Sequence, residues 1–182
     1  MQQVIILSGP PGAGKSSVAE ALCERFDRMV HVEVDGLRHM VKAGYRRPWE
    51  EDRQAREQRL LNVRNACAVA RESIALRYAV VITDVVTAEA AAQYREALAG
   101  VANVHLVTLL PGLDVTLRRD AARGGSSIPE RVRALHPELA RDTASGAIPG
   151  VVLDTSHDID ARATADRVQD AVARGVALFL DP

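Results

Sequence analysis

Short runs of apolar residues, many of them β-branched, alternate along the chain with longer segments that have helical periodicity. The runs show little of the polar alternation of half-exposed strands, which is typical of strands buried on both faces of a parallel sheet. A polar or turn-forming residue follows each run, so we expect short and clearly bounded strands. Five strands are predicted, at residues 4–7, 30–34, 79–83, 104–110 and 151–153.

The segments between these runs carry the spacing of amphipathic helices. The clearest lies at residues 50–77, which contain neither Gly nor Pro. Its apolar residues recur at intervals of three and four, as in Leu60, Val63 and Cys67, and this spacing places them on one face of a helix. Further helices are predicted at residues 15–26, 37–42, 88–98, 113–122, 129–141 and 161–173.

The alternation of strands and helices predicts right-handed βαβ units around a mainly parallel sheet. We therefore expect a three-layer α/β fold, with five strands and helices on both faces, formed by one domain that spans residues 1–182. In such sheets ligands bind beyond the carboxyl ends of the strands. Asp35, Asp84 and Asp154 fall at these predicted ends and are candidates for a site.

The balance of charge excludes some partners. A formal net charge of −1 gives no general attraction to nucleic acid or to anionic membranes, so we expect neither as a partner. No apolar stretch approaches the roughly 20 residues that span a bilayer, and residues 4–7 are too short for a signal peptide. We expect a cytoplasmic protein that is a monomer or a homodimer.

One segment carries a complete phosphate-binding motif. It reads Gly9-Pro10-Pro11-Gly12-Ala13-Gly14-Lys15-Ser16 and matches G-x-x-x-x-G-K-(S/T). Glycines let the backbone N–H groups wrap around phosphate, and the following helix begins at the phosphates, where its dipole favours negative charge. A chance match in a glycine-rich turn is the alternative. The strand before the motif and the helix after it favour the functional interpretation.

The motif assigns roles to single residues. Lys15 is predicted to reach the β- and γ-phosphates of a nucleoside triphosphate, ATP with Mg²⁺, and to face solvent at the loop. Ser16 is a candidate ligand of Mg²⁺, and Ser17 completes the predicted nucleotide-binding segment.

Two aspartates at strand ends complete the predicted chemistry. Asp84 follows residues 80–83 as a metal carboxylate would, and it can serve Mg²⁺ beside Ser16 or position the acceptor. Asp35 can face the γ-phosphate and accept a proton from an attacking hydroxyl. Each of them can instead cap the helix that follows.

Arginines mark two further segments. Arg119 and Arg123 flank a glycine-rich, mobile loop, and a lid at about residues 118–130 is predicted to bring them over the triphosphate. A solvated helix face is the alternative, and it suits Arg118 better than these two. An acceptor-binding segment is predicted at about residues 36–60, with the candidate acceptor ligands Arg38, Arg46, Arg47 and Trp49.

These residues resemble the small-molecule kinases of the P-loop fold, a group that includes shikimate, gluconate, adenylylsulfate and nucleoside monophosphate kinases. Within it the chain is most similar to chloramphenicol phosphotransferase and its kinase-like relatives. The resemblance implies that Asp35 is the base, since residues 34–37 are similar to that family's base segment. It also implies that Arg119 and Arg123 contact adenine or phosphates. The arginines of residues 44–49 differ from the apolar pocket expected for chloramphenicol.

Three functions are compatible with this sequence. The leading prediction is an ATP-dependent phosphotransferase that moves the γ-phosphate to a hydroxyl of a small molecule. An antibiotic-modifying kinase or a toxin-like kinase of nucleotide sugars would share the same layout. An ATP-gated regulatory NTPase is the alternative from another class, and the chain shows neither a basic stripe nor an added recognition domain in its favour.

Overall fold

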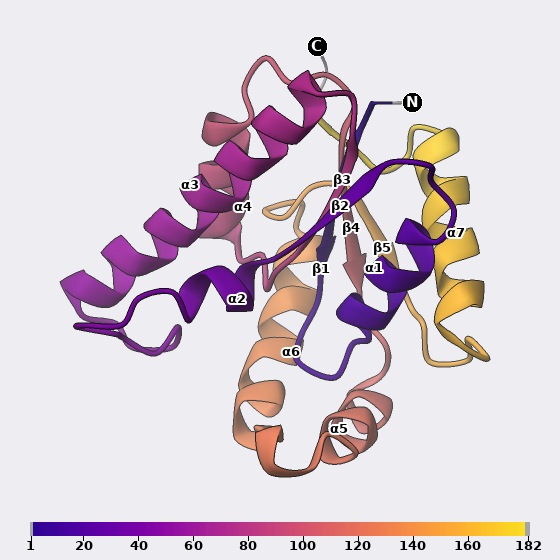
Figure 1. Ribbon diagram of the computed structural model, residues 1–182. Coiled ribbons are helices and arrows are strands. Elements are labelled where there is room, and N and C mark those ends of the chain that lie inside the picture. Colours follow the sequence, from indigo (N-terminus) through magenta and orange to yellow (C-terminus); the bar gives the residue numbers. More distant parts are fainter. Residues whose placement is uncertain (1, 181–182) are drawn as a thin grey trace.

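The apolar runs of the sequence pair into one central sheet in the computed structural model, which describes residues 2–180 (Figure 1). Five parallel strands lie in the order β2-β3-β1-β4-β5. The strands are β1 (Val4–Ser8), β2 (Met29–Glu33), β3 (Ala79–Thr83), β4 (Val104–Leu109) and β5 (Val151–Leu153). A short sixth strand, β6 (Leu178–Leu180), pairs antiparallel with β4.

The centre of the sheet is apolar on both faces because its strands are continuous apolar runs. In β1, the side chains of Val4 and Ile6 belong to the core on one face of the sheet, whereas those of Ile5 and Leu7 belong to the core on the other face. All four residues are fully buried. Since β1 lies between β3 and β4, the loop that follows β1 opens at the middle of the sheet edge.

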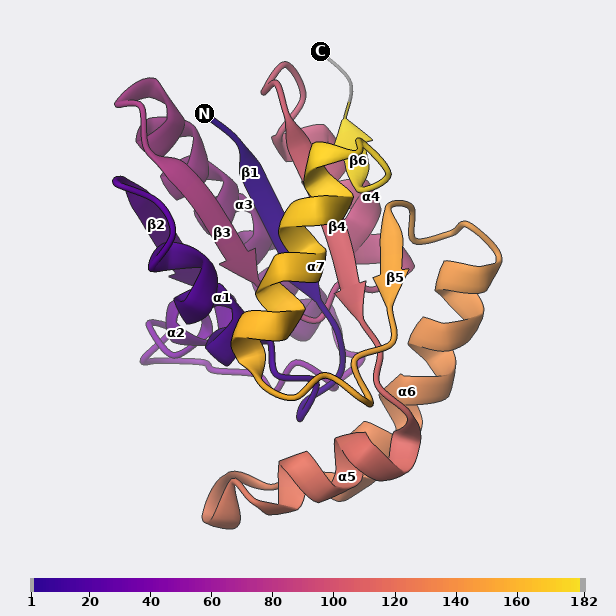
Figure 2. The ribbon, with the colours of Figure 1, turned by 90° about the vertical axis from the view of Figure 1, so that its right-hand side faces the viewer.

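Helices cover both faces, which gives three layers (Figure 2). The core on one face packs against α3, α4 and α6, and the core on the other face packs against α1 and α7. The helices are α1 (Lys15–Cys23), α2 (Val34–Arg38), α3 (Arg53–Ala75), α4 (Ala88–Ala97), α5 (Leu113–Ala121), α6 (Pro129–Ala144) and α7 (Ala161–Ala173). None of the helices within residues 2–180 has the length and hydropathy needed to cross a membrane.

The predicted three-layer α/β fold is confirmed, including its five parallel strands. The short antiparallel strand β6 was not predicted. The predicted helix at residues 50–77 begins later, at Arg53, where the Asp52 side chain accepts a hydrogen bond from the Ala55 N–H. The helix at residues 129–141 continues to Ala144 despite the proline at position 137.

The prediction for residues 30–42 was wrong in one respect that concerns the site. The strand β2 ends at Glu33, and α2 begins immediately at Val34, so the helix lies earlier than the predicted residues 37–42. The buried Val34 side chain packs in the core from a helical backbone, which the sequence pattern did not distinguish from a strand. Asp35 therefore lies in the first turn of α2, where a carboxylate is favoured by the helix dipole.

Candidate active site

The loop between β1 and α1 wraps tightly because its glycines have backbone angles that other residues avoid. Gly9 has φ 143° and Gly12 has φ 83°. A Cβ atom at Gly12 would lie 2.5 Å from the Thr116 carbonyl oxygen and 3.0 Å from the Asp120 nitrogen, both in α5. The phosphate-binding loop, or P-loop (residues 9–16), is thus packed closely against the helix that precedes the predicted lid.

Lys15 does not face solvent as predicted. Its side chain is half-buried, and its Nζ donates to the carbonyl oxygens of Gly9 at 2.7 Å and Pro10 at 3.1 Å. Burial lowers the pKa of Lys15 to about 8, although the nearby Asp35 and Asp84 carboxylates act in the opposite direction. A bound phosphate group would favour the protonated, positively charged form of Lys15, which burial disfavours.

The Ser16 hydroxyl has a carboxylate partner that the sequence analysis did not single out. It donates to Glu33 Oε1 at 3.0 Å. Glu33 is exposed at the end of β2, and it lines the same cavity as the P-loop. Its position at the carboxyl end of a parallel strand, two residues before Asp35, could have identified Glu33 as a candidate site residue.

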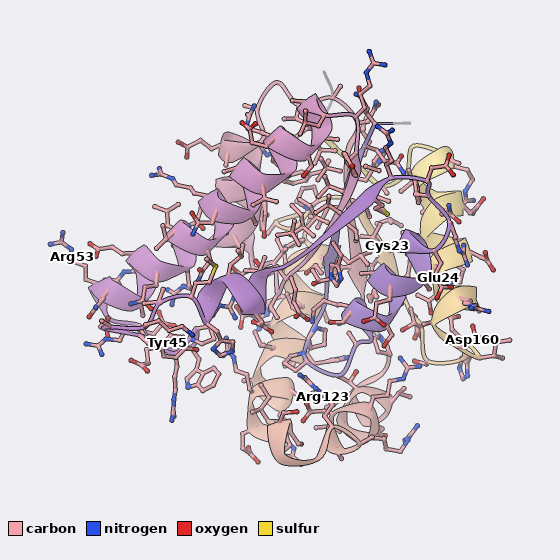
Figure 3. The ribbon with its side chains drawn as sticks, viewed as in Figure 1. Cys23, Glu24, Tyr45, Arg53, Arg123 and Asp160 are labelled. Atoms are coloured by element: carbon pink, nitrogen blue, oxygen red, sulfur yellow. The ribbon has the colours of Figure 1, made fainter. Side chains whose placement is uncertain are left out.

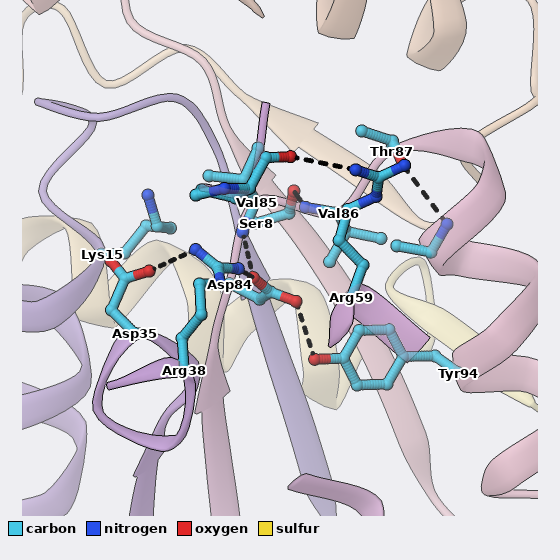
Figure 4. Close-up of polar contacts among 12 residues, drawn as sticks. Ser8, Lys15, Asp35, Arg38, Arg59, Asp84, Val85, Val86, Thr87 and Tyr94 are labelled. Atoms are coloured by element: carbon cyan, nitrogen blue, oxygen red, sulfur yellow. Dashed lines mark hydrogen bonds and ion pairs between the residues drawn. The ribbon is translucent and has the colours of Figure 1, made fainter. Parts of the chain in front are cut away.

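Asp84 follows β3 and is buried in a network of hydrogen bonds (Figure 4). Its Oδ1 accepts from the Val85 N–H at 2.8 Å and from Nη2 of Arg38 at 3.3 Å, and its Oδ2 accepts from the Tyr94 hydroxyl at 3.0 Å. Burial raises the pKa of Asp84, although Arg38 and the hydrogen bonds oppose that shift. Burial and the Asp84 charge together raise the pKa of Tyr94. Asp84 is therefore fixed in place with both oxygens engaged.

Asp35 is the opposite kind of carboxylate. Its side chain is 68% exposed, and its Oδ1 accepts from Nη1 of Arg38 at 2.6 Å. Arg38 thus bridges Asp35 and Asp84, as Figure 4 shows. Because Asp35 is open to solvent, it can receive a proton from a bound molecule, whereas Asp84 is enclosed by protein.

The predicted lid arginines come from the end of α5 and the turn after it. Arg119 donates to the Thr155 carbonyl oxygen at 2.9 Å and thereby joins α5 to the segment after β5. Arg123 has a half-exposed side chain whose Nη1 lies 3.7 Å from Asp120 Oδ1. Both arginines line the cavity over the P-loop. Residues 124–126, predicted as a mobile loop, form a 3₁₀ turn.

Two neighbouring cavities open at this end of the sheet. The P-loop cavity (lined by the P-loop, Glu33, Arg119, Arg123 and residues 158–161) has a volume of about 710 Å³. The acceptor-side cavity, between α2, α3, α4 and α6, has a volume of about 270 Å³. Tyr45 of the smaller cavity and Arg123 and Asp160 of the larger one are labelled toward the lower end of the molecule in Figure 3. Both cavities are lined by Pro11, Asp35, Asp84, Val85 and Ile128.

The structure divides the predicted acceptor ligands into two groups. Arg38 and Trp49 line the acceptor-side cavity. Arg46 and Arg47 are not among its lining residues: Nε of Arg46 lies 3.2 Å from Asp52 Oδ2, and the Arg47 guanidinium stacks over the Trp49 ring. Both guanidinium groups therefore interact with neighbouring residues of the chain, Asp52 and Trp49.

Two other arginines of the acceptor-side cavity were missed. Arg59, on α3, donates to the carbonyl oxygens of Pro48 and Glu50. Arg131, on α6, makes no side-chain ion pair or hydrogen bond with the described residues, and burial lowers its pKa, as does the charge of Arg59. Nothing in the sequence distinguished these two from the other surface arginines, because α3 and α6 meet the site only in the folded chain.

Known structures share this architecture over nearly their whole length. A tunicamycin resistance protein of Deinococcus radiodurans is 21% identical with a TM-score of 0.67, covering 100% of this chain and 99% of that one. A shikimate kinase of Acinetobacter baumannii is 22% identical with a TM-score of 0.64, covering 96% and 95%. An APS kinase of Mycobacterium tuberculosis, in complex with AMPPNP and APS, is 20% identical with a TM-score of 0.65, covering 94% and 98%.

These likenesses confirm the P-loop kinase fold that the sequence predicted. At the level of sequence, residues 4–134 match the family described as AAA domain. The match includes the P-loop, both aspartates and the two lid arginines, and it spans most of the chain. The chain therefore belongs to the AAA domain family and has the fold of the P-loop kinases.

Proposed function

We propose that this protein is an ATP- and Mg²⁺-dependent kinase that transfers the γ-phosphoryl group to a hydroxyl of a small molecule. One observation carries the proposal: the P-loop cavity and the acceptor-side cavity meet at Asp35 and Asp84. Phosphoryl transfer needs a donor site and an acceptor site that are joined in line at a proton acceptor. A protein that only sensed ATP would need the first cavity and not the second.

The P-loop cavity fits a nucleoside triphosphate. The glycine backbone of the loop, the start of α1 and the ammonium group of Lys15 all present positive charge to the same space. Arg119 and Arg123 add two guanidinium groups from α5 and the turn after it. These residues would hold the phosphates and neutralise the charge that builds up during transfer.

Ser16 and two carboxylates are suited to Mg²⁺, which bound with ATP would neutralise phosphate oxygens and orient the γ-phosphoryl group. The Ser16 hydroxyl would be a direct ligand. Glu33 lies within hydrogen-bonding distance of that hydroxyl, so it would hold water molecules of the ion in place. Asp84 also lines the cavity, but its oxygens are already engaged by Arg38 and Tyr94, which favours an indirect role.

Asp35 would accept the proton of the acceptor hydroxyl. It is exposed where the two cavities meet. Arg38, which also lies in α2, donates a hydrogen bond to Oδ1 of Asp35. The contrast with the enclosed Asp84 supports Asp35 as the base and Asp84 as a residue that orders the site.

The acceptor-side cavity suits a small molecule that carries an anionic group. Arg38 is already paired with Asp35 and Asp84, whereas the Arg131 side chain forms no ion pair with the described residues. The carboxylates of Glu138 and Glu51 favour its charged form more than the charge of Arg59 opposes it. A carboxylate or phosphate of the acceptor would give the Arg131 guanidinium a charged partner inside the cavity. A volume of about 270 Å³ admits a compact molecule. Trp49 and Val63 provide apolar contacts on the α3 side.

An antibiotic or nucleotide-sugar acceptor would use the same reaction. The similarity to a tunicamycin resistance protein is the observation that favours an antibiotic-related role. Against a large antibiotic stand the small volume of the cavity and its arginines. The anionic, compact acceptor is therefore the version that we place first.

A screen would test the proposal. Purified protein is incubated with Mg²⁺, ATP and single hydroxyl compounds, in matched pairs that differ only by an anionic group. ADP formation and the mass of the product are both recorded. We expect one or more hydroxy acids or sugar phosphates to stimulate ADP release and gain a phosphoryl group, while their neutral partners do not. Stimulation by neutral members alone would overturn the anionic acceptor and leave the kinase assignment in place.

A further inference from the structure

The end of α5 contains a buried carboxylate that belongs to neither cavity. Asp120 has an exposure of 0%. Its Oδ2 accepts from the Ser127 hydroxyl at 2.8 Å and from the Ile128 N–H at 2.8 Å. These bonds tie the end of α5 to the residue immediately before α6 and close the intervening segment into a ring. A buried carboxylate that spans a loop in this way keeps the loop in one conformation.

The second oxygen of Asp120 faces Arg123. Asp120 Oδ1 is buried and accepts no hydrogen bond from the described residues, and Nη1 of Arg123 lies 3.7 Å from it. Arg123 in turn lines the P-loop cavity, where its charge contributes to lowering the pKa of Lys15. One carboxylate therefore contacts the lid turn through one oxygen and the lid arginine through the other.

Asp120 is also anchored to the P-loop. The glycine at position 12 packs so closely that an added Cβ would lie 3.0 Å from the Asp120 nitrogen and 3.1 Å from its Cβ. The backbone of Asp120 is thus fixed relative to the phosphates' site, while its side chain fixes residues 123–128. This is the arrangement needed to transmit the position of the P-loop to the lid.

We propose that Asp120 is a positioning residue that latches residues 123–128 against the P-loop and aims Arg123 at the phosphate site. The role of Arg123 in this proposal rests on the proposed function. The latch itself does not, because the hydrogen bonds to Ser127 and Ile128 exist in the protein without nucleotide. If Asp120 acted only through its negative charge, it would oppose phosphate binding, and its removal would strengthen binding. If Asp120 aims Arg123, its removal should weaken binding.

Two substitutions separate the roles. Asp120→Asn keeps an oxygen that can accept from Ser127 and Ile128 but removes the charge that faces Arg123. Titration of each variant with Mg²⁺ and a non-hydrolysable ATP analogue gives the dissociation constant. We expect Asp120→Asn to weaken binding about threefold to tenfold, even though it removes a negative charge from beside the phosphates. Arg123→Ala should weaken binding about tenfold, and adding Asp120→Asn to it should change the value by less than about twofold.

Tighter binding by Asp120→Asn, or a full additional loss in the Arg123→Ala background, would overturn the aiming role. The latch is tested separately by hydrogen exchange in the free protein. Asp120→Ala should speed exchange at residues 123–128 and leave exchange in α7 unchanged. Asp120→Asn should leave exchange unchanged in both segments. Unchanged exchange in Asp120→Ala would overturn the latch. If the wild-type protein binds no triphosphate analogue, the proposed function fails, and the exchange result still decides the latch.

Discussion

The two cavities of this protein are built in different ways. The P-loop cavity is lined by a run of consecutive residues, 11–18, and glycines with positive φ set the backbone shape of its loop. The acceptor-side cavity takes its polar groups from side chains on α2, α3, α4 and α6, which are far apart in sequence. A local motif thus defines the proposed phosphate donor site, and tertiary packing defines the proposed acceptor site.

This difference has a functional consequence. Backbone N–H groups recognise phosphate in any nucleotide, and so the donor site changes little when a surface side chain is replaced. A cavity lined by side chains changes its ligand when one arginine moves or disappears. We therefore expect substitutions in the donor site to abolish all activity and substitutions in the acceptor site to change which compounds react.

The largest effect should come from Lys15→Ala. The variant loses the charge that the P-loop cavity places on the phosphates, so phosphoryl transfer should be abolished. The fold should persist, because Nζ of Lys15 donates its hydrogen bonds to carbonyl oxygens of its own loop. Product formation and the melting temperature are measured together. Lys42, the other lysine of the chain, is exposed and gives the matched control Lys42→Ala, which should retain full activity.

The two carboxylates at the junction of the cavities should respond differently to removal of their charge. Asp35→Asn should lower kcat by roughly 10²–10⁴-fold, the usual contribution of a general base. The melting temperature should not change, because the side chain is 68% exposed. Nucleotide affinity should also be retained, since the amide keeps the shape of the carboxylate. An Asp35→Asn enzyme with near-normal kcat would exclude this residue as the base.

Asp84→Asn should instead raise the Mg²⁺ concentration needed for half-maximal rate. It should also lower the melting temperature, because Arg38 and Tyr94 lose a buried charged partner. Titration of the rate with Mg²⁺ for both variants compares the two roles directly. A Mg²⁺ requirement that rises in Asp35→Asn and not in Asp84→Asn would show that the roles are exchanged.

The acceptor-side cavity should be sensitive to Arg131→Ala. Loss of one charge-assisted hydrogen bond should raise KM for an anionic acceptor about tenfold, with little change in KM for ATP. Arg133 on the same helix is exposed and pairs with Glu130 at 2.7 Å, so Arg133→Ala is the matched control and should behave as wild type. Equal KM values in the two variants would exclude Arg131 from acceptor binding.

The smallest effect concerns pH. The pKa of Lys15 is about 8 in the free protein, and bound phosphate would raise it, so binding takes up a proton above that pH. The dissociation constant for an ATP analogue should therefore increase roughly fourfold from pH 7 to pH 8.5. Lys15→Arg keeps a charge that does not titrate and should remove most of this increase. A dissociation constant in the wild-type protein that does not change over this range would contradict the assigned state of Lys15.

The sequence was sufficient for the five parallel strands and for the P-loop, because both depend on contiguous patterns. Val4 to Leu7 followed by the glycines of residues 9–14 predicted a buried strand, a phosphate loop and a helix in the correct order. Glu33 and Asp120 were missed because their partners, Ser16 and Ile128, become neighbours only after folding. Arg46 and Arg47 stay predicted acceptor ligands, and nothing in the local sequence indicated their contacts with Asp52 and Trp49.

In the proposed reaction, the γ-phosphoryl group is transferred from ATP in the P-loop cavity to a molecule in the acceptor-side cavity. The most direct test measures, in one reaction, the amount of ADP released and the amount of phosphorylated acceptor formed. The account predicts equal amounts in the wild-type protein and neither product in Lys15→Ala. ADP release that proceeds at the same rate with and without every acceptor, with free phosphate as the only other product, would contradict it and favour an ATP-gated NTPase.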